Sequence, residues 1–117
     1  MIKKLILGTA QFGLNYGINN TCGKPNEDKI RQMLDFAYTN NIEWLDTADA
    51  YGNANELIGQ YFRDHGQRFK INTKFKDISD SITNQLKSSL SKLNINQVDT
   101  YFYHSYDDFK NKPELLN

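Results

Sequence analysis

Four side chains with the chemistry of proton transfer each come at or just after the end of a predicted strand: Asp46, Tyr51, Lys74 and His104. In proteins that alternate parallel strands with helices, functional groups collect at the C-terminal ends of the strands. A carboxylate, a phenol, an amine and an imidazole brought together there could deliver a proton to a carbonyl oxygen. The spacing therefore predicts an acid–base site at this end of a sheet.

Each residue type suits one part of such a reaction. Tyr51 could donate a proton to the carbonyl oxygen while the carbon receives a hydride, but a free phenol has a pKa of about 10, too high for an efficient acid near neutral pH. A neighbouring ammonium group stabilises a phenolate and lowers this pKa, and Lys74 could be that group. Asp46 could balance the charge of a buried lysine. His104 could donate a hydrogen bond that holds the substrate oxygen.

Each of these residues also has an ordinary structural explanation. An aspartate after a strand is often a turn former, and a tyrosine in a loop more often serves packing. His104 could be satisfied by a backbone carbonyl. Lys74 could lie at the surface, although it follows an apolar strand, where solvated lysines are less usual. The placement of all four at three successive strand ends favours the functional interpretation.

The elements that must position these residues alternate along the chain. Apolar runs bounded by polar residues and glycines predict four strands, at residues 5–7, 42–46, 69–75 and 98–103. Helical patterns separate the last three strands, and a glycine-rich loop over residues 9–25 precedes the first helix. This order predicts an α/β fold with a four-stranded parallel sheet and three helices on one face, as in the wall of a (β/α) barrel.

Polar residues mark the helix starts. Asn26 should cap the first helix, and Asn53 with Glu56 should form a capping box for the second. Ser79 or Asp80 should cap the third. That third helix should bury one apolar face, made of Ile82, Leu86, Leu90 and Leu93.

The length and composition of the chain predict a single domain and favour neither nucleic acid nor a membrane as its partner. The 117 residues carry no net charge, so nothing favours nucleic acid or an acidic membrane surface. Cys22 is the only cysteine, so an internal disulfide and a cysteine-based metal site are excluded. The N-terminal Lys3-Lys4 pair and the short apolar run after it are too short for a signal peptide or a membrane span. We expect a cytoplasmic protein that binds no metal.

The end of the sequence suggests an unfinished pattern. Pro113 and Glu114 resemble the first turn of a fourth helix, and the sequence stops about one turn later, too soon for a stable helix. We therefore expect residues 1–117 to be an incomplete half-barrel of about four βα units, truncated at the start of the fourth helix.

The motifs around the four residues resemble those of the aldo-keto reductase family. They are Leu-Gly-Thr at 7–9, Asp-Thr-Ala-Asp-Ala-Tyr-Gly at 46–52, Asn-Ala-Asn-Glu-Leu-Ile-Gly at 53–59, Thr-Lys at 73–74 and His104. The resemblance covers nearly the whole chain, and the stretch from Gly8 to Gly17 resembles a bacterial branch associated with surface-sugar biosynthesis. Ser105 departs from the family, in which a large or basic residue more often follows the histidine, and the family's N-terminal hairpin is missing.

The resemblance implies an eight-stranded (β/α) barrel that transfers hydride between NADP(H) or NAD(H) and a small-molecule carbonyl substrate. It implies that Tyr51 is the general acid, that Lys74 tunes it, that Asp46 pairs with Lys74 and that His104 orients the substrate. Cofactor-binding positions near the nicotinamide ribose would be Gly8, Thr9, Ala10 and Asp46. In the family, later strands carry the residues that stack on the nicotinamide and grip the cofactor phosphates.

Two main hypotheses follow. The chain is the N-terminal half of a carbonyl reductase, or it is a catalytically inactive half-barrel remnant or partner-dependent module. A metal-dependent hydrolase would need more histidine and aspartate ligands than the chain offers. In isolation we expect negligible cofactor binding and no reductase activity. We also expect self-association through the unpaired edges at residues 5–7 and 98–103.

Overall fold

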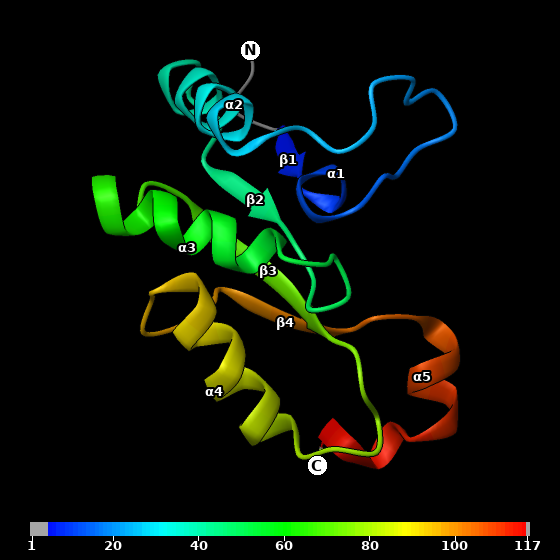
Figure 1. Ribbon diagram of the computed structural model, residues 1–117. Helices are drawn as coiled ribbons and strands as arrows, with labels where there is room; N and C mark the ends of the chain where they lie inside the picture. Colours follow the sequence, from blue (N-terminus) through cyan, green and yellow to red (C-terminus); the bar gives the residue numbers. More distant parts are fainter. Residues whose placement is uncertain (1–4, 117) are drawn as a thin grey trace.

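A computed structural model describes residues 5–116, and Lys3, Lys4 and Asn117 lie outside the described residues. Its centre is a four-stranded parallel sheet in the order β1-β2-β3-β4, shown in Figure 1. The strands are β1 (Ile6–Gly8), β2 (Trp44–Asp46), β3 (Lys70–Phe75) and β4 (Thr100–Tyr103). The predicted parallel sheet and strand order are confirmed, although the second and fourth strands begin two residues later than predicted.

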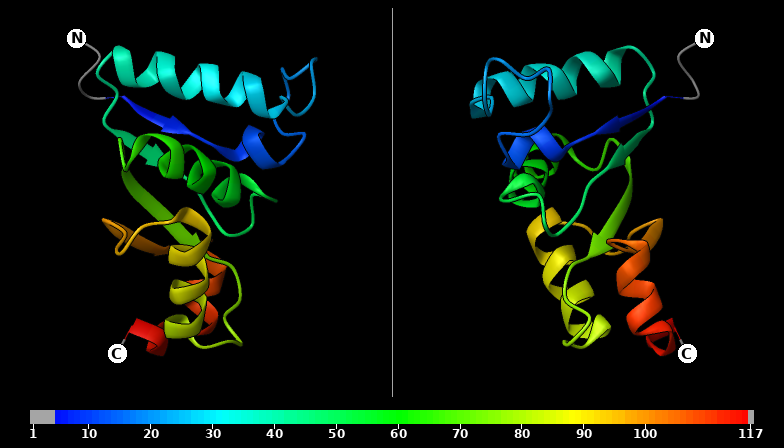
Figure 2. Two further views of the ribbon diagram at one scale, coloured as in Figure 1. Left: turned by 60° about the vertical axis from the view of Figure 1, so that its left-hand side comes forward. Right: turned by 90° about the vertical axis from the view of Figure 1, so that its right-hand side faces the viewer.

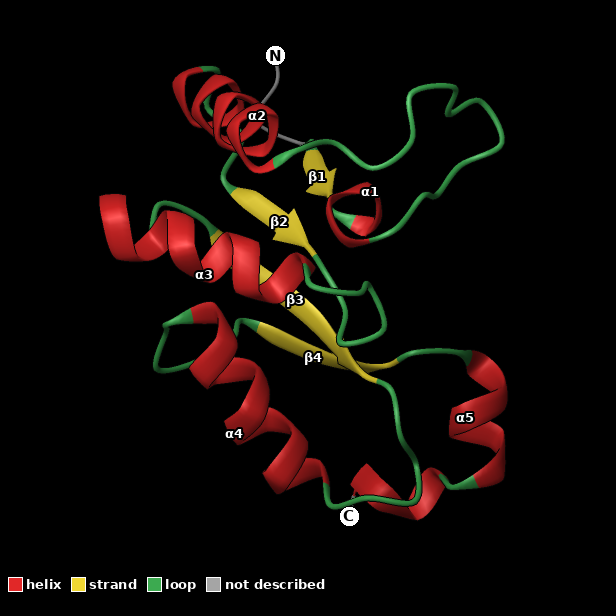
Figure 3. Cartoon of the chain, in the orientation of Figure 1, coloured by secondary structure: helices red, strands yellow, loops and turns green. Residues whose placement is uncertain are grey.

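The long helices are α2 (Glu27–Thr39), α3 (Ala54–His65) and α4 (Ile82–Leu93), and each connects two neighbouring strands. Figure 2 shows all three along the same face of the sheet, as predicted. Two short helices follow strands directly, α1 (Ala10–Gly13) after β1 and α5 (Tyr106–Asn111) after β4. Figure 3 shows both at the end of the sheet where the strands terminate.

Three local predictions were wrong. The predicted loop at residues 9–25 contains helix α1, and residues Pro113–Leu116 form a 3₁₀ turn (η2) where an α-helix was expected to begin. Ser81, rather than Ser79 or Asp80, caps α4, because the Ser79 hydroxyl donates to Asp77 instead.

The side-chain caps of the other helices differ from each other. The Asn26 side chain accepts from the Lys29 amide at 2.8 Å, so the predicted cap of α2 is confirmed. Asn53 is the N-cap residue of α3, but its side-chain oxygen accepts from Lys24 Nζ at 2.6 Å and not from the helix. The predicted capping box is therefore wrong, because a residue from the distant β1–α2 loop takes the Asn53 oxygen.

The core lies between the helices and one face of the sheet. Leu45 and Ile71 are buried there and form one cluster with Ile58 of α3 and Leu34 of α2. Phe75 lies on the same face of β3 as Ile71, as the two-residue alternation of strands requires, and its ring contacts those of Tyr101 and Tyr103. The opposite face would line the interior of a closed barrel. There Ile6 is 51% exposed and Phe102 is 46% exposed, so this face is open to solvent.

Helix α4 buries a different stripe from the predicted one. Leu93 is buried, but Ile82, Leu86 and Leu90 are only half-buried, while Gln85 and Ser89 are buried. Both polar residues have hydrogen-bond partners in the loops that follow the strands. Gln85 donates to the carbonyl of Asp77 and Ser89 donates to the carboxylate of Asp49.

Two further features bear on the protein class. Along residues 5–116, every helix is too short or too polar to cross a membrane. Within the same range, no three histidine, cysteine or acidic side chains gather in a way that could hold a metal ion.

Candidate active site

Asp46 and Lys74 come together on the open face of the sheet. Each lies at or near the C-terminal end of its strand, β2 for Asp46 and β3 for Lys74, and their strands are direct neighbours. Lys74 Nζ lies 2.9 Å from Asp46 Oδ1 and donates a second hydrogen bond to the Thr47 carbonyl at 3.0 Å. The Lys74 side chain is 17% exposed and that of Asp46 is 39% exposed. The ammonium is thus mostly withdrawn from water and held by two oxygen acceptors.

Tyr51 lies in the β2–α3 loop, next to this ion pair. Its amide donates to the Ala48 carbonyl and its own carbonyl accepts from the Ala54 amide, which makes a tight turn into helix α3. Lys74 Nζ lies 5.3 Å from the centre of the Tyr51 ring. At this distance the lysine charge is attracted to the electron-rich face of the ring. The ion pair and the phenol therefore form one cluster.

His104 approaches the same tyrosine from strand β4. The two rings meet edge to face, with their centres 6.3 Å apart and their planes at 76°. His104 is exposed and follows the last residue of β4. The structure thus brings all four predicted residues to one end of the sheet, with Tyr51 between Lys74 and His104.

The predicted cofactor-binding residues border the cluster. Gly8, Thr9 and Ala10 line a depression of about 210 Å³ together with Asp46 and Tyr51. Both the amide and the hydroxyl of Thr9 donate to the Asp46 carbonyl, at 3.0 and 3.1 Å, which fixes the end of β1 to the end of β2. Apart from its two chain neighbours, a Cβ atom at Gly8 would meet no atom of residues 5–116 within 4 Å. Glycine at this position keeps free space directly beside Asp46.

A second depression of about 480 Å³ continues across the open face of the sheet. It shares Gly8 and Asp46 with the first and adds Asn72, Lys74 and Phe102. Asn72 was missed by the sequence reasoning, although it precedes Lys74 by two residues and must share its face of β3. Its side-chain oxygen is buried and accepts no hydrogen bond from the described part of the chain. Asn72 therefore borders the depression, while its oxygen lies beneath the surface.

Two glycines bring helix α1 against the loop that carries Tyr51. A Cβ atom at Gly13 would overlap the carbonyl oxygen of Tyr51, and one at Gly52 would overlap the carbonyl oxygen of Gly13. Gly52 also has a φ of +55°, in the left-handed region that favours glycine. The close approach of the two backbones thus needs both glycines, and it places α1 beside the candidate acid.

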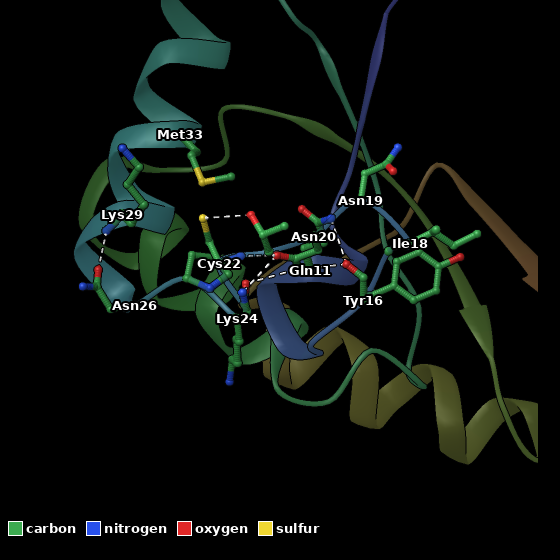
Figure 4. Close-up of a pocket in the computed structure, with 14 residues that line it drawn as sticks. Gln11, Tyr16, Ile18, Asn19, Asn20, Cys22, Lys24, Asn26, Lys29 and Met33 are labelled. Atoms are coloured by element: carbon green, nitrogen blue, oxygen red, sulfur yellow. Dashed lines mark hydrogen bonds between the residues drawn. The ribbon is translucent and has the colours of Figure 1, made fainter.

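The β1–α2 loop surrounds a larger open pocket of about 1320 Å³, next to the site. Figure 4 shows Gln11 and Asn20 both directed at the Tyr16 carbonyl, to which each donates at 2.9 Å. The Asn20 oxygen also accepts from the amides of Cys22 and Gly23. Asn20 therefore organises the loop from within. Gln11 and Tyr16 line both this pocket and the depression beside Tyr51.

Sequence comparison agrees with this arrangement. The sequence model of the aldo/keto reductase family matches residues 4–115. The chain belongs to the aldo/keto reductase family. It is 30% identical to the oxidoreductase sirO of Leptosphaeria maculans over 122 aligned residues, which include 97% of the chain and 36% of that protein. It is 28% identical to the aldo-keto reductase str7 of Strobilurus tenacellus, over 86% of the chain and 32% of that protein.

Solved structures of aldo-keto reductases have the same fold over this part of their length. One from Pseudomonas aeruginosa superimposes with a TM-score of 0.72 at 21% identity, covering 93% of this chain and 50% of that one. One from Klebsiella pneumoniae, solved in complex with NADPH, superimposes with a TM-score of 0.62 at 17% identity. The match covers 93% of this chain and 41% of that one. This aldo/keto reductase chain thus spans about a third of its curated relatives and half or less of these structures.

Proposed function

We propose that residues 1–117 form the N-terminal half of a (β/α)₈ carbonyl reductase and supply its proton-donating groups. The observation that carries the proposal is the cluster of Lys74, Asp46 and Tyr51 at the C-terminal ends of neighbouring strands, bordered by free space at Gly8. The substrate class is a small aldehyde or ketone, reduced to an alcohol. Membership of an oxidoreductase family supports this reaction type.

The residues present fit the nicotinamide end of an NADP(H) or NAD(H) molecule. The open space beside Gly8 would accept a flat ring, and the half-exposed carboxylate of Asp46 offers acceptors to an adjoining ribose or amide. Thr9 and Ala10 would line the same end. The bound cofactor supplies hydride to the carbonyl carbon. The cation lining these depressions, Lys74, is already paired with Asp46, so these two depressions offer little to the cofactor phosphates.

Each side chain of the cluster has one task in the proposed reaction. Tyr51 donates its phenolic proton to the carbonyl oxygen as the carbon is reduced. Lys74 stabilises the phenolate that remains, because its positive charge lies over the ring. Asp46 holds Lys74 in place through their hydrogen bond. His104, beside Tyr51, donates a hydrogen bond to the same oxygen and aligns it.

The test of this function joins the chain to four further βα units and measures loss of NADPH absorbance with a panel of aldehydes and ketones. Tyr51→Phe should lower turnover by on the order of 10²–10⁴, the usual contribution of a positioned acid. Tyr38→Phe is the matched control, because Tyr38 is a half-exposed tyrosine on helix α2, away from the cluster. Equal turnover of the Tyr51 and Tyr38 variants would remove Tyr51 from the mechanism.

The second candidate is an inactive half-barrel or a module that works with a partner. The open face of the sheet favours it, because Ile6 and Phe102 are half-exposed on the strands at the two edges. A second copy of the chain could pair its β4 with this β1, and its β1 with this β4, and both edges would close. A cytoplasmic location stays a prediction from the sequence.

Cofactor titration of the chain itself measures how much of the cofactor grip its residues supply. Trp44 is the only tryptophan and lies two residues before Asp46 on β2, so its fluorescence reports on the site. The proposal expects no saturable change up to millimolar NADPH. Saturable binding at micromolar concentration would show that the missing phosphate contacts contribute less than proposed.

A further inference from the structure

Asp49 lies three residues after Asp46, but its side chain turns away from the candidate active site. Its Oδ1 atom accepts hydrogen bonds from the Ser89 hydroxyl at 2.6 Å and from the Asn55 side-chain amide at 3.1 Å. Ser89 belongs to α4 and Asn55 to α3, and they are 1% and 3% exposed. One carboxylate thus fastens the β2–α3 loop to two helices at once.

A second set of bonds ties the same loop to Lys74. The Thr47 hydroxyl donates to Asn55 Oδ1 at 2.9 Å, so two loop residues converge on one asparagine. The Asp49 amide donates to the Lys74 carbonyl at 3.0 Å, and Lys74 Nζ donates back to the Thr47 carbonyl at 3.0 Å. The loop is therefore held on the helix side by Asp49 and on the sheet side by Lys74. Tyr51 is two residues beyond Asp49.

The Asp49 carboxylate is partly removed from water at this position, which disfavours its charged form. Burial raises the pKa of Asp49 above its usual value, although hydrogen bonds from Ser89 and Asn55 and the charges of Lys92 and Lys76 oppose the rise. Forming a turn does not require such burial. The exposed Asp77 in the β3–α4 loop accepts from the hydroxyl and the amide of Ser79, at 2.6 and 2.8 Å, entirely at the surface.

We propose that Asp49 is a positioning residue for Tyr51, which it holds between Lys74 and His104 by fastening the β2–α3 loop to Asn55 and Ser89. The role rests on the proposed function of Tyr51 as the acid. The placement of the ring, however, is a property of the folded chain and is measurable without any turnover. A failure of the reductase proposal would leave the ring contacts unchanged, so the two proposals fail separately.

The readout is the nuclear Overhauser effect between the rings of Tyr51 and His104 in the 117-residue chain. Selective labelling of tyrosine and histidine rings keeps the spectrum readable even for a dimer, and Tyr51→Phe and His104→Gln assign the signals. Asp49→Ala removes the acceptor for both hydrogen bonds. Asp49→Asn keeps an oxygen acceptor in the same place, and Asp77→Ala is the matched control, because it breaks a similar carboxylate–serine pair at the surface.

We expect Asp49→Ala to lose the ring–ring signal while the backbone amide spectrum remains that of a folded chain. Asp49→Asn should recover most of the signal, and Asp77→Ala should leave it unchanged. An unchanged signal in folded Asp49→Ala would overturn the proposal. If Asp49→Ala does not fold, Ser89→Ala decides: a weakened signal supports the proposal, and an unchanged one overturns it.

Discussion

Replacing Gly13 by alanine should displace Tyr51, although residue 13 has no reactive side chain. The new Cβ atom would overlap the Tyr51 carbonyl oxygen and lie 2.9 Å from the Ala54 amide nitrogen. Both atoms belong to the backbone of the turn into α3, where they bond each other at 3.0 Å. Neither can swing aside as the end of a flexible side chain would.

Two effects of opposite sign determine how Gly13→Ala changes the free energy of unfolding. Alanine is a better helix former than glycine, by up to about 1 kcal/mol, and Gly13 is the last residue of α1. Overpacking against fixed atoms usually costs about 1–3 kcal/mol. The overlap with backbone atoms makes the second effect larger, so we expect Gly13→Ala to lower the free energy of unfolding by roughly 1–2 kcal/mol.

The displacement should also be visible in catalysis. The two backbones must separate by about 1 Å or more, and a shift of that size in a catalytic group can cost on the order of 10² in turnover. Urea unfolding of the chain and turnover of a complete enzyme measure the two consequences. Gly8→Ala controls for stability, because its Cβ would meet no described atom within 4 Å apart from its two chain neighbours. A Gly13→Ala variant as stable as the wild type, with full turnover, would refute the reasoning.

Three further predictions concern charge and exposure. Lys74→Met should lower the free energy of unfolding by no more than about 1 kcal/mol, because Asp46 is 39% exposed and its carboxylate can return to water. It should nevertheless lower turnover of the complete enzyme by on the order of 10². A loss of several kcal/mol in stability would show that the ion pair mainly holds the fold. Burial raises the pKa of Asp49 in the folded chain above its value of 3.8 in the unfolded chain. The stability that Asp49 contributes is therefore fully present at a pH below 3.8, and it is lost as the pH rises through the pKa of the folded chain. Wild-type stability relative to Asp49→Asn should therefore fall as pH rises from 3.8 towards neutrality, and a constant difference would contradict this. Phe102→Glu on the edge strand β4 should shift the sedimentation of the chain towards a monomer, while Tyr106→Glu on α5 should not; equal effects would argue against self-association through the sheet.

The sheet was predictable because each strand is a short segment that carries apolar, aromatic or β-branched residues and lies between polar loops. The same feature placed Asp46 and Lys74 correctly at the strand ends. The Asn26 cap was equally local, since the side chain bonds an amide only three residues away. Signals of this kind need no knowledge of distant parts of the chain.

Two of the details that failed depend on contacts between distant segments. Asn53 lost its expected helix cap because Lys24, 29 residues earlier, donates to its side chain. Ser89 is buried on α4 because Asp49, 40 residues earlier, accepts from it. Helical periodicity ranks side chains by apolar character, so it selected Leu86 and Leu90 in place of this serine. The residue types that form these hydrogen bonds can be read from the sequence, but which distant residues they pair with cannot.

Most contacts that position Tyr51 come from the first three βα units, and His104 adds a ring contact from the end of β4. Helix α1 packs on the loop through Gly13, Lys24 bonds Asn53 at the loop's end, and Asp49 fastens its middle. The side chains of the candidate site are therefore placed by contacts among the described residues. Among the described residues, the cation that lines the two depressions at the strand ends is Lys74, and it is already paired with Asp46. We therefore expect proton donation and cofactor affinity to depend on different parts of the fold. A chain with this sequence should hold an ordered Tyr51 cluster while binding NADPH negligibly.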